Sequence, residues 1–327
     1  MTFLVTGSAG HLGEALMRTL GRSGHDARGL DIKPSPFTHH VGSIVDRAFV
    51  EQGMRGVEVV FHAATLHKPH IATHSRQNFV DVNVTGTLNL LEAASAAGVK
   101  AFIYTSTTST FGRALVPPPG APAAWITEDV MPRAKNIYGA TKLAAEHLCE
   151  MFQHRSGLPC LVLRTSRFFP EDDDDRGVRK EFQDDNLKVN ELLYRRADIE
   201  DIVSAHLLAA EQAADIGFDR FIISATSPFT REDLPELRSN PAAVVRRYAP
   251  SFEAEYARRG WSLMKAVDRV YVNDRARRRL GWQPRYDFAT ALAQLIKGED
   301  YRSPLAVETG AKGYHAEAFA DGPYPTE

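Results

Sequence analysis

The chain has 327 residues, of which 43% are hydrophobic and 24% charged, and a formal charge of −2, which is typical of a globular protein with one large core or two unequal domains. This near balance of charge excludes the basic surface that nucleic acid or an anionic membrane would require, so we expect small-molecule partners. Two cysteines, Cys149 and Cys160, exclude a disulfide framework and a zinc cluster, and no signal peptide or membrane anchor is recognised, so we expect a cytoplasmic protein.

Short apolar segments alternate with helical patterns over the first half of the chain. Strands are predicted at 2–7, 27–32, 57–64, 101–106 and 160–166, and helices at 14–24, 89–100 and 141–157. Strands that alternate with helices of this length indicate βαβ units, so we expect a parallel sheet that continues to about residue 166.

The pattern changes after this point. A polar stretch follows PEDDDDRG and runs to Arg196, after which a helix at 201–213 and a strand at 218–224 return to the main body. The segment from Thr230 to about Ile296 predicts two helices, an isolated strand at 271–273 and a turn at 280–287, which we interpret as a small, discontinuous second lobe. The tail from Glu299 has turn formers and no period, so it is either disordered or laid over a neighbouring surface.

Two clusters suggest metal ligands at first sight. The acidic run from Asp172 to Asp175 cannot direct four adjacent carboxylates at one ion, and a solvated loop is the favoured interpretation. The histidines lack both a helical HExxH motif and neighbouring cysteines; they are His39, His40, His67, His70 and His74. No metal site is predicted.

Three glycines, Gly7, Gly10 and Gly13, stand between the first strand and the following helix. The first permits a tight turn, the second lets the backbone approach a pyrophosphate, and the third brings the helix against the strand. Free N–H groups and the helix dipole then favour a phosphate at the helix N-terminus. The spacing G-x-x-G-x-x-G is one residue longer in its first interval than the usual dinucleotide-binding pattern.

An acidic residue closes the second predicted strand. Asp31 lies 18 residues after Gly13, near the spacing of about 20 residues expected for the carboxylate that binds the adenosine ribose. Such a carboxylate accepts hydrogen bonds from the ribose hydroxyls and repels a 2′-phosphate. We therefore expect NAD rather than NADP, with Arg28 and Lys33 beside the position softening that repulsion.

Tyr138 and Lys142 are four residues apart in IYGATKLAAEHL, which places both on one helix face. A neighbouring ammonium stabilises a phenolate, so we expect it to lower the tyrosine pKa from about 10 toward neutrality and make the phenol a usable acid and base. Upstream lies a run of six hydroxyl side chains from Thr105 to Thr110, which is either a strand end with a polar turn or the source of a reacting hydroxyl.

The chain resembles the extended short-chain dehydrogenase/reductase superfamily, and within it the NAD-dependent epimerase/dehydratase family, over residues 2 to about 296. The resemblance is carried by TGSAGHLG, Asp31, FHAA, NVTGTLNLLEAA, YTSTTSTFG, YGATK, LVLRTS and RARRRLGWQP. It implies an α/β fold, a Rossmann-type doubly wound parallel sheet with a small C-terminal substrate-binding lobe. The NAD-binding domain is then 1–166 with returning segments at about 197–228, the lobe is about 167–196 and 229–298, and the irregular tail is 299–327.

The resemblance also implies roles for individual residues. Thr107 hydrogen-bonds the reacting oxygen, Tyr138 exchanges its proton, and Lys142 also holds the nicotinamide ribose. The implied cofactor-binding residues are Gly7, Ala9, Gly10, His11, Leu12, Gly13, Asp31, Ile32, Ser43, Ile44, Ala63, Ala64, Thr65, Asn83, Thr105, Tyr138, Lys142 and Thr165. The implied substrate-binding residues are Thr108, Ser109 and Arg167.

Departures from the family pattern bear on the reaction and the substrate. Sugar 4,6-dehydratases carry an Asp-Glu pair directly after the reacting Thr, where this chain has Thr108 and Ser109, so we do not expect dehydration. Arg167 replaces an Asn that contacts sugar or nucleotide, and Ser43 replaces the Asp that usually contacts adenine. Within a substrate pocket Arg167 would favour a carboxylate or phosphate; alternatively it forms a salt bridge to the acidic loop 171–175.

These features predict an NAD-dependent oxidoreductase or epimerase that transfers hydride at a hydroxyl or carbonyl of a sugar, sugar acid or nucleotide sugar. The alternative is a non-catalytic NAD(P)-binding sensor or scaffold on the same fold; proteins of that type generally lose the Tyr or the Lys, and this chain keeps both. The resemblance further implies a homodimer, in which helices at 83–98 and 138–154 pair across a two-fold axis. The apolar residues expected in that contact are Leu88, Leu91, Leu143 and Leu148.

Overall fold

The computed structural model describes residues 1–315 and 319, and its centre is a parallel sheet of seven strands in the order β3-β2-β1-β4-β5-β7-β8. The strands are β1 (Thr2–Thr6), β2 (Asp26–Asp31), β3 (His40–Val41), β4 (Val59–His62), β5 (Ala101–Thr107), β7 (Cys160–Thr165) and β8 (Phe218–Ile223). The strand order reverses direction next to β1, so the carboxyl ends of β1 and β4 flank the crevice where ligands bind in such sheets. The predicted α/β class and Rossmann-type sheet are confirmed.

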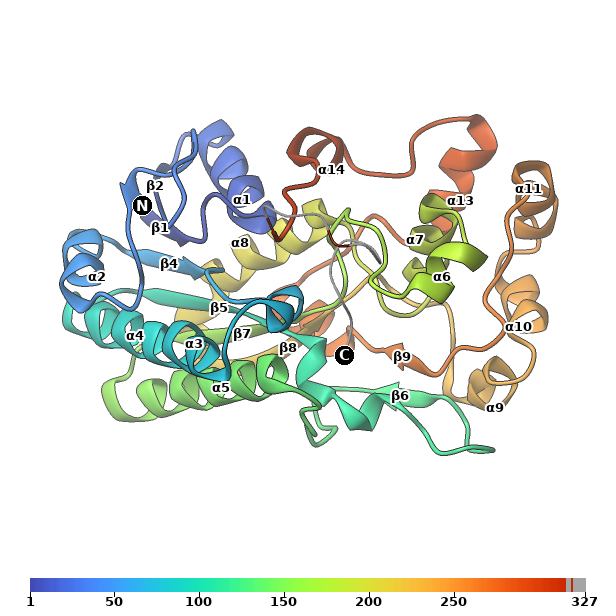
Figure 1. The fold of residues 1–327 in the computed structure, drawn as a ribbon, viewed down its shortest axis with the longest axis horizontal. Helices are drawn as coiled ribbons and strands as arrows, with labels where there is room; N and C mark the ends of the chain where they lie inside the picture. Colours follow the sequence, from blue (N-terminus) through green and yellow to red (C-terminus); the bar gives the residue numbers. More distant parts are fainter. Residues whose placement is uncertain (316–318, 320–327) are drawn as a thin grey trace.

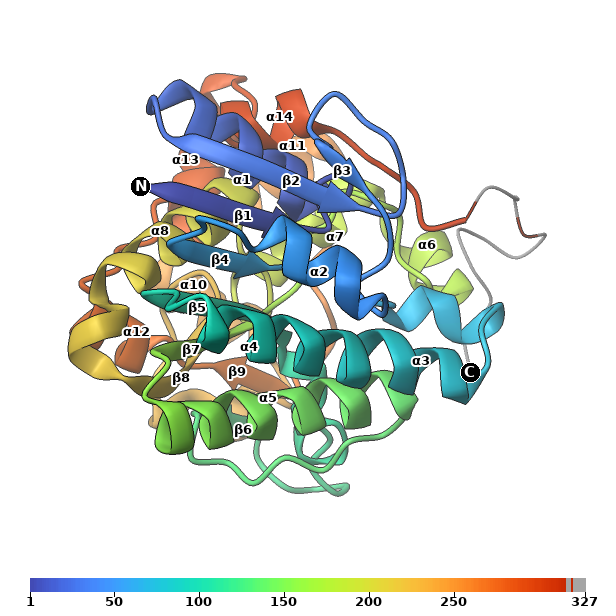
Figure 2. The same cartoon turned by 90° about the vertical axis from the view of Figure 1, so that its left-hand side faces the viewer.

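Helices cover both faces of the sheet (Figures 1 and 2). One face carries α1 (His11–Arg22), α8 (Ile199–Ile216), α12 (Asp274–Leu280) and α14 (Pro304–Thr309). The other carries α2 (Arg47–Gly53), α4 (Gly86–Ala96) and α5 (Ile137–Ser156). The alternation of side chains along each strand supplies both faces: in β1, Phe3 and Val5 enter the first hydrophobic cluster and Leu4 enters the second.

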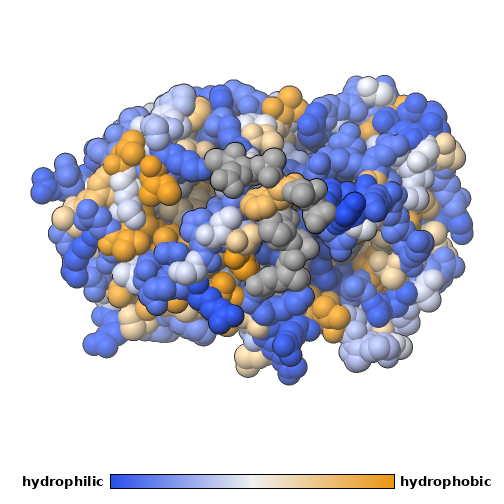
Figure 3. Space-filling model, viewed as in Figure 1, coloured by the Kyte–Doolittle hydropathy of each residue, from blue (hydrophilic) through white to orange (hydrophobic). Residues whose placement is uncertain are grey.

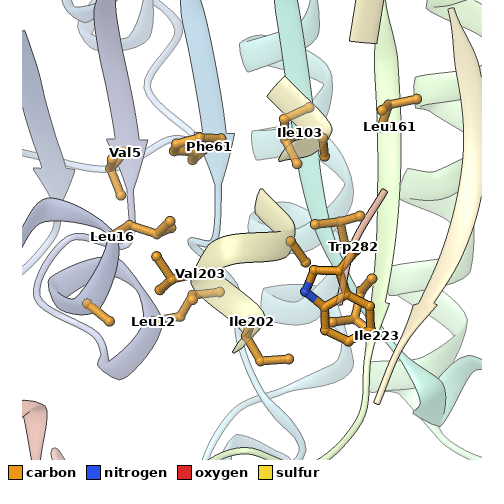
Figure 4. Packing of buried hydrophobic residues seen from close by; sticks show 14 of the residues in the cluster. Val5, Leu12, Leu16, Phe61, Ile103, Leu161, Ile202, Val203, Ile223 and Trp282 are labelled. Carbon is orange, nitrogen blue, oxygen red and sulfur yellow. The ribbon is translucent and has the colours of Figure 1, made fainter. Parts of the chain in front are cut away.

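Figure 4 shows the cluster beneath α1 and α8, where Leu16 and Val203 face the strand residues Val5 and Phe61. Trp282 follows α12 and is fully buried in the same cluster, and its indole N–H donates to the carbonyl of Asp201 at 3.1 Å. The late motif LGWQP therefore fixes the segment between α12 and the following helix to α8.

A separate hydrophobic cluster forms the second lobe, seen on the right of Figure 1. Its helices are α7 (Asp184–Leu192), α9 (Leu234–Leu237), α10 (Pro241–Tyr248), α11 (Phe252–Arg259) and α13 (Phe288–Lys297). Beside it, β6 (Ala124–Ile126) pairs in parallel with β9 (Arg269–Tyr271). The cluster draws residues from both sides of the returning segment, which supports a discontinuous lobe, while the proposed domain boundaries stay a prediction.

The second lobe differs from the sequence prediction in detail. Five α-helices, α9 to α13, lie where two were predicted between residues 230 and 296, and the polar stretch before Arg196 contains α6 (Arg176–Glu181) and α7. None of these helices exceeds 10 residues, so each is too short to give a clear period. The strand predicted at 271–273 lies at 269–271 and is paired, not isolated.

The α4 and α5 helices lie side by side on the outer face of the sheet (Figure 2), where α3 (Arg76–Val80) precedes them. Leu91 is fully buried within the chain's own core, so its proposed place in a dimer contact is wrong. Leu88 and Leu143 are only partly buried and remain available on this surface.

The tail contains α14 and then lies against the start of α1. The carbonyl of Gly310 is 3.0 Å from the His11 ring, and the ammonium of Lys312 is 2.6 Å from the Glu14 carboxylate. This part of the tail therefore lies on a neighbouring surface of the protein. Of the two alternatives predicted for the tail, disorder or packing on such a surface, the second is confirmed for these residues. The rest of the predicted irregular tail, residues 316–318 and 320–327, lies outside the described residues. No helix in the described part of the chain is long and apolar enough to cross a membrane.

Candidate active site

The glycine loop joins the end of β1 to α1. Gly7 has φ +74°, and a side chain there would meet the backbone of Ala64 at 2.8 Å; one at Gly13 would overlap the Gly7 carbonyl. The loop therefore requires glycine at both positions. Gly10 caps α1 without any side-chain hydrogen bond, so it leaves the first helical N–H groups, those of His11 to Gly13, without a side-chain acceptor.

Asp31 lies beside this loop at the carboxyl end of β2. Its carboxylate accepts hydrogen bonds from the backbone N–H of Ala9 at 3.0 Å and of Lys33 at 2.9 Å. The side chain thus ties the glycine loop to β2. Ile32 is 66% exposed, and two further valines close by in sequence are also exposed, Val41 by 55% and Val45 by 37%.

The remaining predicted cofactor residues differ in what their side chains contact. Ser43 accepts from the N–H of Val45, and Ile44 is buried against Gly86. Ala63, Ala64 and Thr65 follow β4 at the same edge of the sheet. The buried Asn83 side chain is occupied inside the protein: it accepts from Thr65 and Leu66 and donates to Leu66 and Thr141. It lies in a π-helical turn (Asp81–Thr85) and shapes the loop after β4.

These features fit NAD. The uncapped start of α1 offers N–H groups to a pyrophosphate, and the glycine loop brings the backbone close enough to use them. The Asp31 carboxylate is placed to receive ribose hydroxyls. The uncovered apolar side chains near Asp31 suit one face of an adenine ring, and Figure 3 shows apolar residues gathered on the side of this view that holds the N-terminal strands.

Tyr138 and Lys142 lie in the first turns of α5, whose cap is the side chain of Asn136. Both are buried, and Tyr138 shares a hydrogen bond with the hydroxyl of Thr107 at the end of β5. The Nζ of Lys142 donates to the Thr105 carbonyl at 2.7 Å and lies 4.2 Å from the centre of the Tyr104 ring. The structure therefore brings the three predicted catalytic residues together.

A cavity of about 210 Å³ opens beside Tyr138 and Thr107. It lies between the carboxyl edge of the sheet and the second lobe. The predicted residues that line it are Thr107, Thr108, Ser109, Tyr138, Thr165 and Arg167, and the others are His67, Lys68, Pro69, Leu115, Ser166, Phe168, Phe169, Asp174, Arg195, Arg269, Tyr271 and Tyr314.

The expected lowering of the Tyr138 pKa is not found. Burial raises the pKa of Tyr138, and the hydrogen bond with Thr107 only partly opposes this. Burial has the opposite effect on Lys142: it lowers the pKa from 10.5 to about 7, although Glu146 and Cys149 act to raise it. Desolvation disfavours the charged form of each group, and the Lys142 ammonium is engaged with the Thr105 carbonyl.

The hydroxyl run divides between the cavity and the protein interior. Thr107 and Thr108 line the cavity together with Ser109, whose N–H donates to the Thr107 hydroxyl at 3.1 Å. The Thr105 hydroxyl is instead 2.9 Å from the buried ring of His206, so only its carbonyl faces Lys142. The Thr110 hydroxyl donates to the Thr107 carbonyl at 2.8 Å and supports the turn.

Sequence reasoning missed a buried network behind the Tyr–Lys pair. The Glu146 carboxylate accepts from Ser106 at 2.5 Å and pairs with Arg164 at 2.7 Å. Glu146 follows Lys142 by four residues, so it lies on the same face of α5 as Tyr138 and Lys142. This spacing could have predicted its place beside the pair. His67, which was considered only as a metal ligand, stacks on Tyr138 with ring centres 5.3 Å apart.

The acidic run is only in part the solvated loop that was predicted, because Asp172 and Asp175 are exposed and the two residues between them are not. Asp173 is buried and pairs with Arg167 at 2.7 Å, and Asp174 pairs with Lys68 at 2.5 Å. The salt bridge considered for Arg167 is thus present, and Arg167 also lines the cavity, so the two interpretations do not exclude each other. Among residues 1–315 and 319, no group of three or more His, Cys, Asp or Glu could hold a metal ion.

This fold, with a glycine loop after β1 and a Tyr–Lys pair on α5, is that of the extended short-chain dehydrogenase/reductase class. The model of the NAD dependent epimerase/dehydratase family matches residues 3–223, and the chain belongs to this family. NAD is accordingly its cofactor.

Individual relatives differ in what they act on. The chain is 25% identical to a 3-beta-hydroxysteroid dehydrogenase of Mycolicibacterium neoaurum, with 90% of each chain covered. It is 27% identical to a UDP-glucose 4-epimerase of Mycolicibacterium smegmatis, covering 91% of this chain and 98% of that one. A 34% match to an uncharacterized protein of Sinorhizobium fredii covers 50% of this chain and only 40% of that protein.

The fold is also found among solved structures. A short-chain dehydrogenase/reductase superfamily protein from Agrobacterium tumefaciens with bound NAD superposes with a TM-score of 0.65 at 24% identity, over 91% of this chain and 98% of that chain. This likeness supports the fold.

Proposed function

We propose that the protein is an NAD-dependent dehydrogenase, reductase or epimerase that transfers hydride at a hydroxyl or carbonyl carbon of a sugar, sugar acid or nucleotide sugar. The observation that carries the proposal is the placement of Tyr138 and Thr107 on the cavity lining, at the same sheet edge as the glycine loop, with Lys142 buried one helical turn after Tyr138. The family is shared with both a steroid dehydrogenase and a sugar-nucleotide epimerase, so the relatives do not select the substrate.

Each catalytic residue has one task in this proposal. In oxidation, Tyr138 takes the proton of the substrate hydroxyl while the carbon loses its hydride, and Thr107 holds the reacting oxygen by a hydrogen bond. Lys142 lies within the same buried group and stabilises the phenolate that this chemistry needs. NAD, when bound, supplies the hydride acceptor, and its positive nicotinamide would favour the phenolate that burial alone disfavours.

Elimination of water is not part of the proposal. Thr108 and Ser109 are hydroxyl residues, and Asp174, the one carboxylate among the described residues that line the cavity, is already paired with Lys68. The chain does not offer the acid and base that a 4,6-dehydratase requires. Transient and net hydride transfer both remain open.

The test is turnover by Tyr138→Phe. Loss of the phenol oxygen should lower NADH formation on an accepted substrate by roughly 10²–10⁴-fold, as for other positioned proton carriers. NAD affinity, measured by calorimetry, should stay near the wild-type value, because the ring remains. Full activity in this variant would refute the proposed roles, and wild-type protein that binds NAD without turning over any sugar would favour the sensor or scaffold alternative.

We further propose a homodimer through α4 and α5. Their outer surface carries the partly buried Leu88 and Leu143, together with Met151, which is 40% exposed. The cytoplasmic location stays a prediction.

A further inference from the structure

We propose that the cavity selects a small substrate with an anionic group, a carboxylate or a phosphate, and that Arg269, Arg195 and Arg167 bind this group. The inference rests on the proposed function, because it concerns the substrate of the same site. It is carried by the charges around the cavity and by arginine atoms that have no partner within the described protein.

Cations outnumber carboxylates on the cavity wall. Its described lining residues include the four cations Lys68, Arg167, Arg195 and Arg269 and the single carboxylate Asp174. Lys68 and Asp174 pair with each other at 2.5 Å, so their charges cancel. The positive charges of the three arginines must therefore be compensated by carboxylates outside the cavity lining or by a ligand.

One buried carboxylate supports two of these arginines. Glu191 on α7 is 2.7 Å from Arg195 and 3.3 Å from Arg167, and it also pairs with Arg196 at 2.9 Å. Burial alone would raise the pKa of Glu191, but the three guanidinium groups outweigh it and lower the pKa to about 2. Asp173 forms an ion pair with Arg167 and also acts on Arg195, so two carboxylates face three guanidiniums and positive charge is left at the cavity.

Arg269 has no such support. Its backbone lies in β9, and within residues 1–315 and 319 its guanidinium forms no ion pair. The Nε atoms of Arg167, Arg195 and Arg269 are all buried without a hydrogen-bond partner. Buried donors are paired in nearly all protein interiors, so three unpaired guanidinium donors on residues that line one cavity indicate a missing acceptor.

Two of the three arginines pack against aromatic rings. Arg167 lies 5.0 Å from the centre of the Phe169 ring, and Arg195 lies 5.3 Å from that of Tyr194. Stacking of this kind restrains a guanidinium plane, which suits the planar, bidentate recognition of a carboxylate or phosphate. The site is therefore prepared for an oxyanion before one binds.

The size of the cavity restricts what carries the anion. Its volume of about 210 Å³ lies below the range of roughly 300–1,000 Å³ that is usual for pockets of drug-sized ligands. Tyr138 and Thr107 line the same cavity as the three arginines, so the anionic group and the reacting carbon belong to one compact molecule. A uronic acid or a sugar phosphate fits this description better than a nucleotide sugar.

The test separates binding from turnover. The Tyr138→Phe protein, saturated with NAD, is titrated with D-glucuronate, D-glucose 6-phosphate and D-glucose in a calorimeter. At least one of the two acidic sugars should bind roughly 10- to 100-fold more tightly than glucose, the range expected for hydrogen bonds to a charged group. Whichever acid binds more tightly identifies the anionic group, and equal affinity for all three would overturn the inference.

Variants of Arg269 assign the effect to the site. Arg269→Gln, in the same background, should remove most of the preference for the acidic sugar over glucose, while Arg269→Lys should keep part of it. The matched control is Arg246→Gln, on the exposed surface of α10, where Arg246 pairs with Glu253 outside the cavity. Unchanged preference in a folded Arg269→Gln protein would overturn the role of Arg269.

Failure of the proposed function gives a different result. If the acidic sugars bind tightly but wild-type protein forms no NADH with any of them, the anion site stands and the chemistry is wrong. If wild-type protein oxidises glucose as readily as glucuronate and glucose 6-phosphate, the chemistry stands and the anion site is wrong.

Discussion

Asp31 has two separable tasks. Its carboxylate already accepts the N–H groups of Ala9 and Lys33 and so fixes the glycine loop. We propose that its remaining acceptor capacity receives the adenosine ribose hydroxyls, which makes it the main source of preference between NAD and NADP. Arg28 and Lys33 were expected to soften the repulsion between Asp31 and the 2′-phosphate of NADP. The Arg28 guanidinium, however, donates to the carbonyl of Arg55 at 2.8 Å.

Replacement of Asp31 by Ala should weaken NAD binding by roughly 10- to 100-fold, the usual range for hydrogen bonds to a charged group. NADP binding should weaken less or improve, because the charge that repels its 2′-phosphate is gone. Titration of both cofactors into the apo protein measures the ratio. Asp26→Ala, in the exposed part of the same strand, is the control and should leave the ratio unchanged. A preserved ratio in Asp31→Ala would remove Asp31 from ribose recognition.

Spacing along the chain reveals some site residues and hides others. Tyr138, Lys142 and the glycine loop follow local rules, since a helix turn or a strand-to-helix turn determines where they point. The orientation of the Thr105 side chain is determined by its hydrogen bond with His206. This residue is 101 residues away in the sequence and reaches β5 only when α8 packs on the sheet. Arg269 is equally hidden, because a short strand 102 residues after Arg167 brings it to the cavity.

At the scale of elements, the sheet and the second lobe differed in predictability. Strands buried on both faces, such as β5 and β7, begin with four apolar residues in a row, AFIY and CLVL, which is a clear strand signal. The helices of the second lobe are short, and α7 (DDNLKVNEL) contains only three large apolar residues. Its polar residues are buried by specific pairing, as with Asn190 and the Tyr256 hydroxyl at 2.8 Å, which no hydropathy pattern shows.

The α4–α5 surface carries the prediction about assembly. Leu143→Glu should convert the proposed dimer to monomer, because a charge placed in an apolar helix contact must be desolvated. Sedimentation velocity over a range of protein concentrations measures the mass. The control is Ile296→Glu on α13, a residue 50% exposed on the second lobe, which should leave the dimer intact. A wild-type mass equal to the monomer at every concentration would refute the dimer.

For the molecule as a whole, burial of neutral histidines sets the response to acid. Burial lowers the pKa of five of them: His11 to about 4, His62 well below its ordinary value, His67 to about 3, His70 to about 4 and His206 to about 4. Each makes contacts inside the fold that use the neutral ring, as His62 does between Thr6 and Thr87 at 2.8 and 2.9 Å. Burial raises the pKa of the Asp201 carboxyl to about 6, so this group has the opposite effect on stability in acid.

The sign follows from proton uptake. Below about pH 6.5 the unfolded chain protonates these histidines while the folded chain does not, so the free energy of unfolding falls as pH drops from 6.5 toward 4. Asp201 is protonated in the folded chain near pH 6 and in the unfolded chain only near 3.8, so it gains stability over the same window. Burial also raises the pKa of Glu128 and Asp184, which act in the same sense as Asp201, but the five histidines outnumber these three carboxyl groups, so a net loss is expected.

Urea unfolding at pH 7.5 and pH 5.5 should therefore show a lower free energy of unfolding at pH 5.5. His206→Gln tests the cause, because glutamine can hydrogen-bond Thr105 but cannot take up a proton, so its difference between the two pH values should be smaller than in wild type. His154→Gln, at an exposed position on α5, should show the wild-type difference. If wild-type protein were as stable at pH 5.5 as at pH 7.5, the buried rings would have to accept protons in the folded state, and a neutral His206 that accepts the hydrogen bond of the Thr105 hydroxyl would be the wrong assignment.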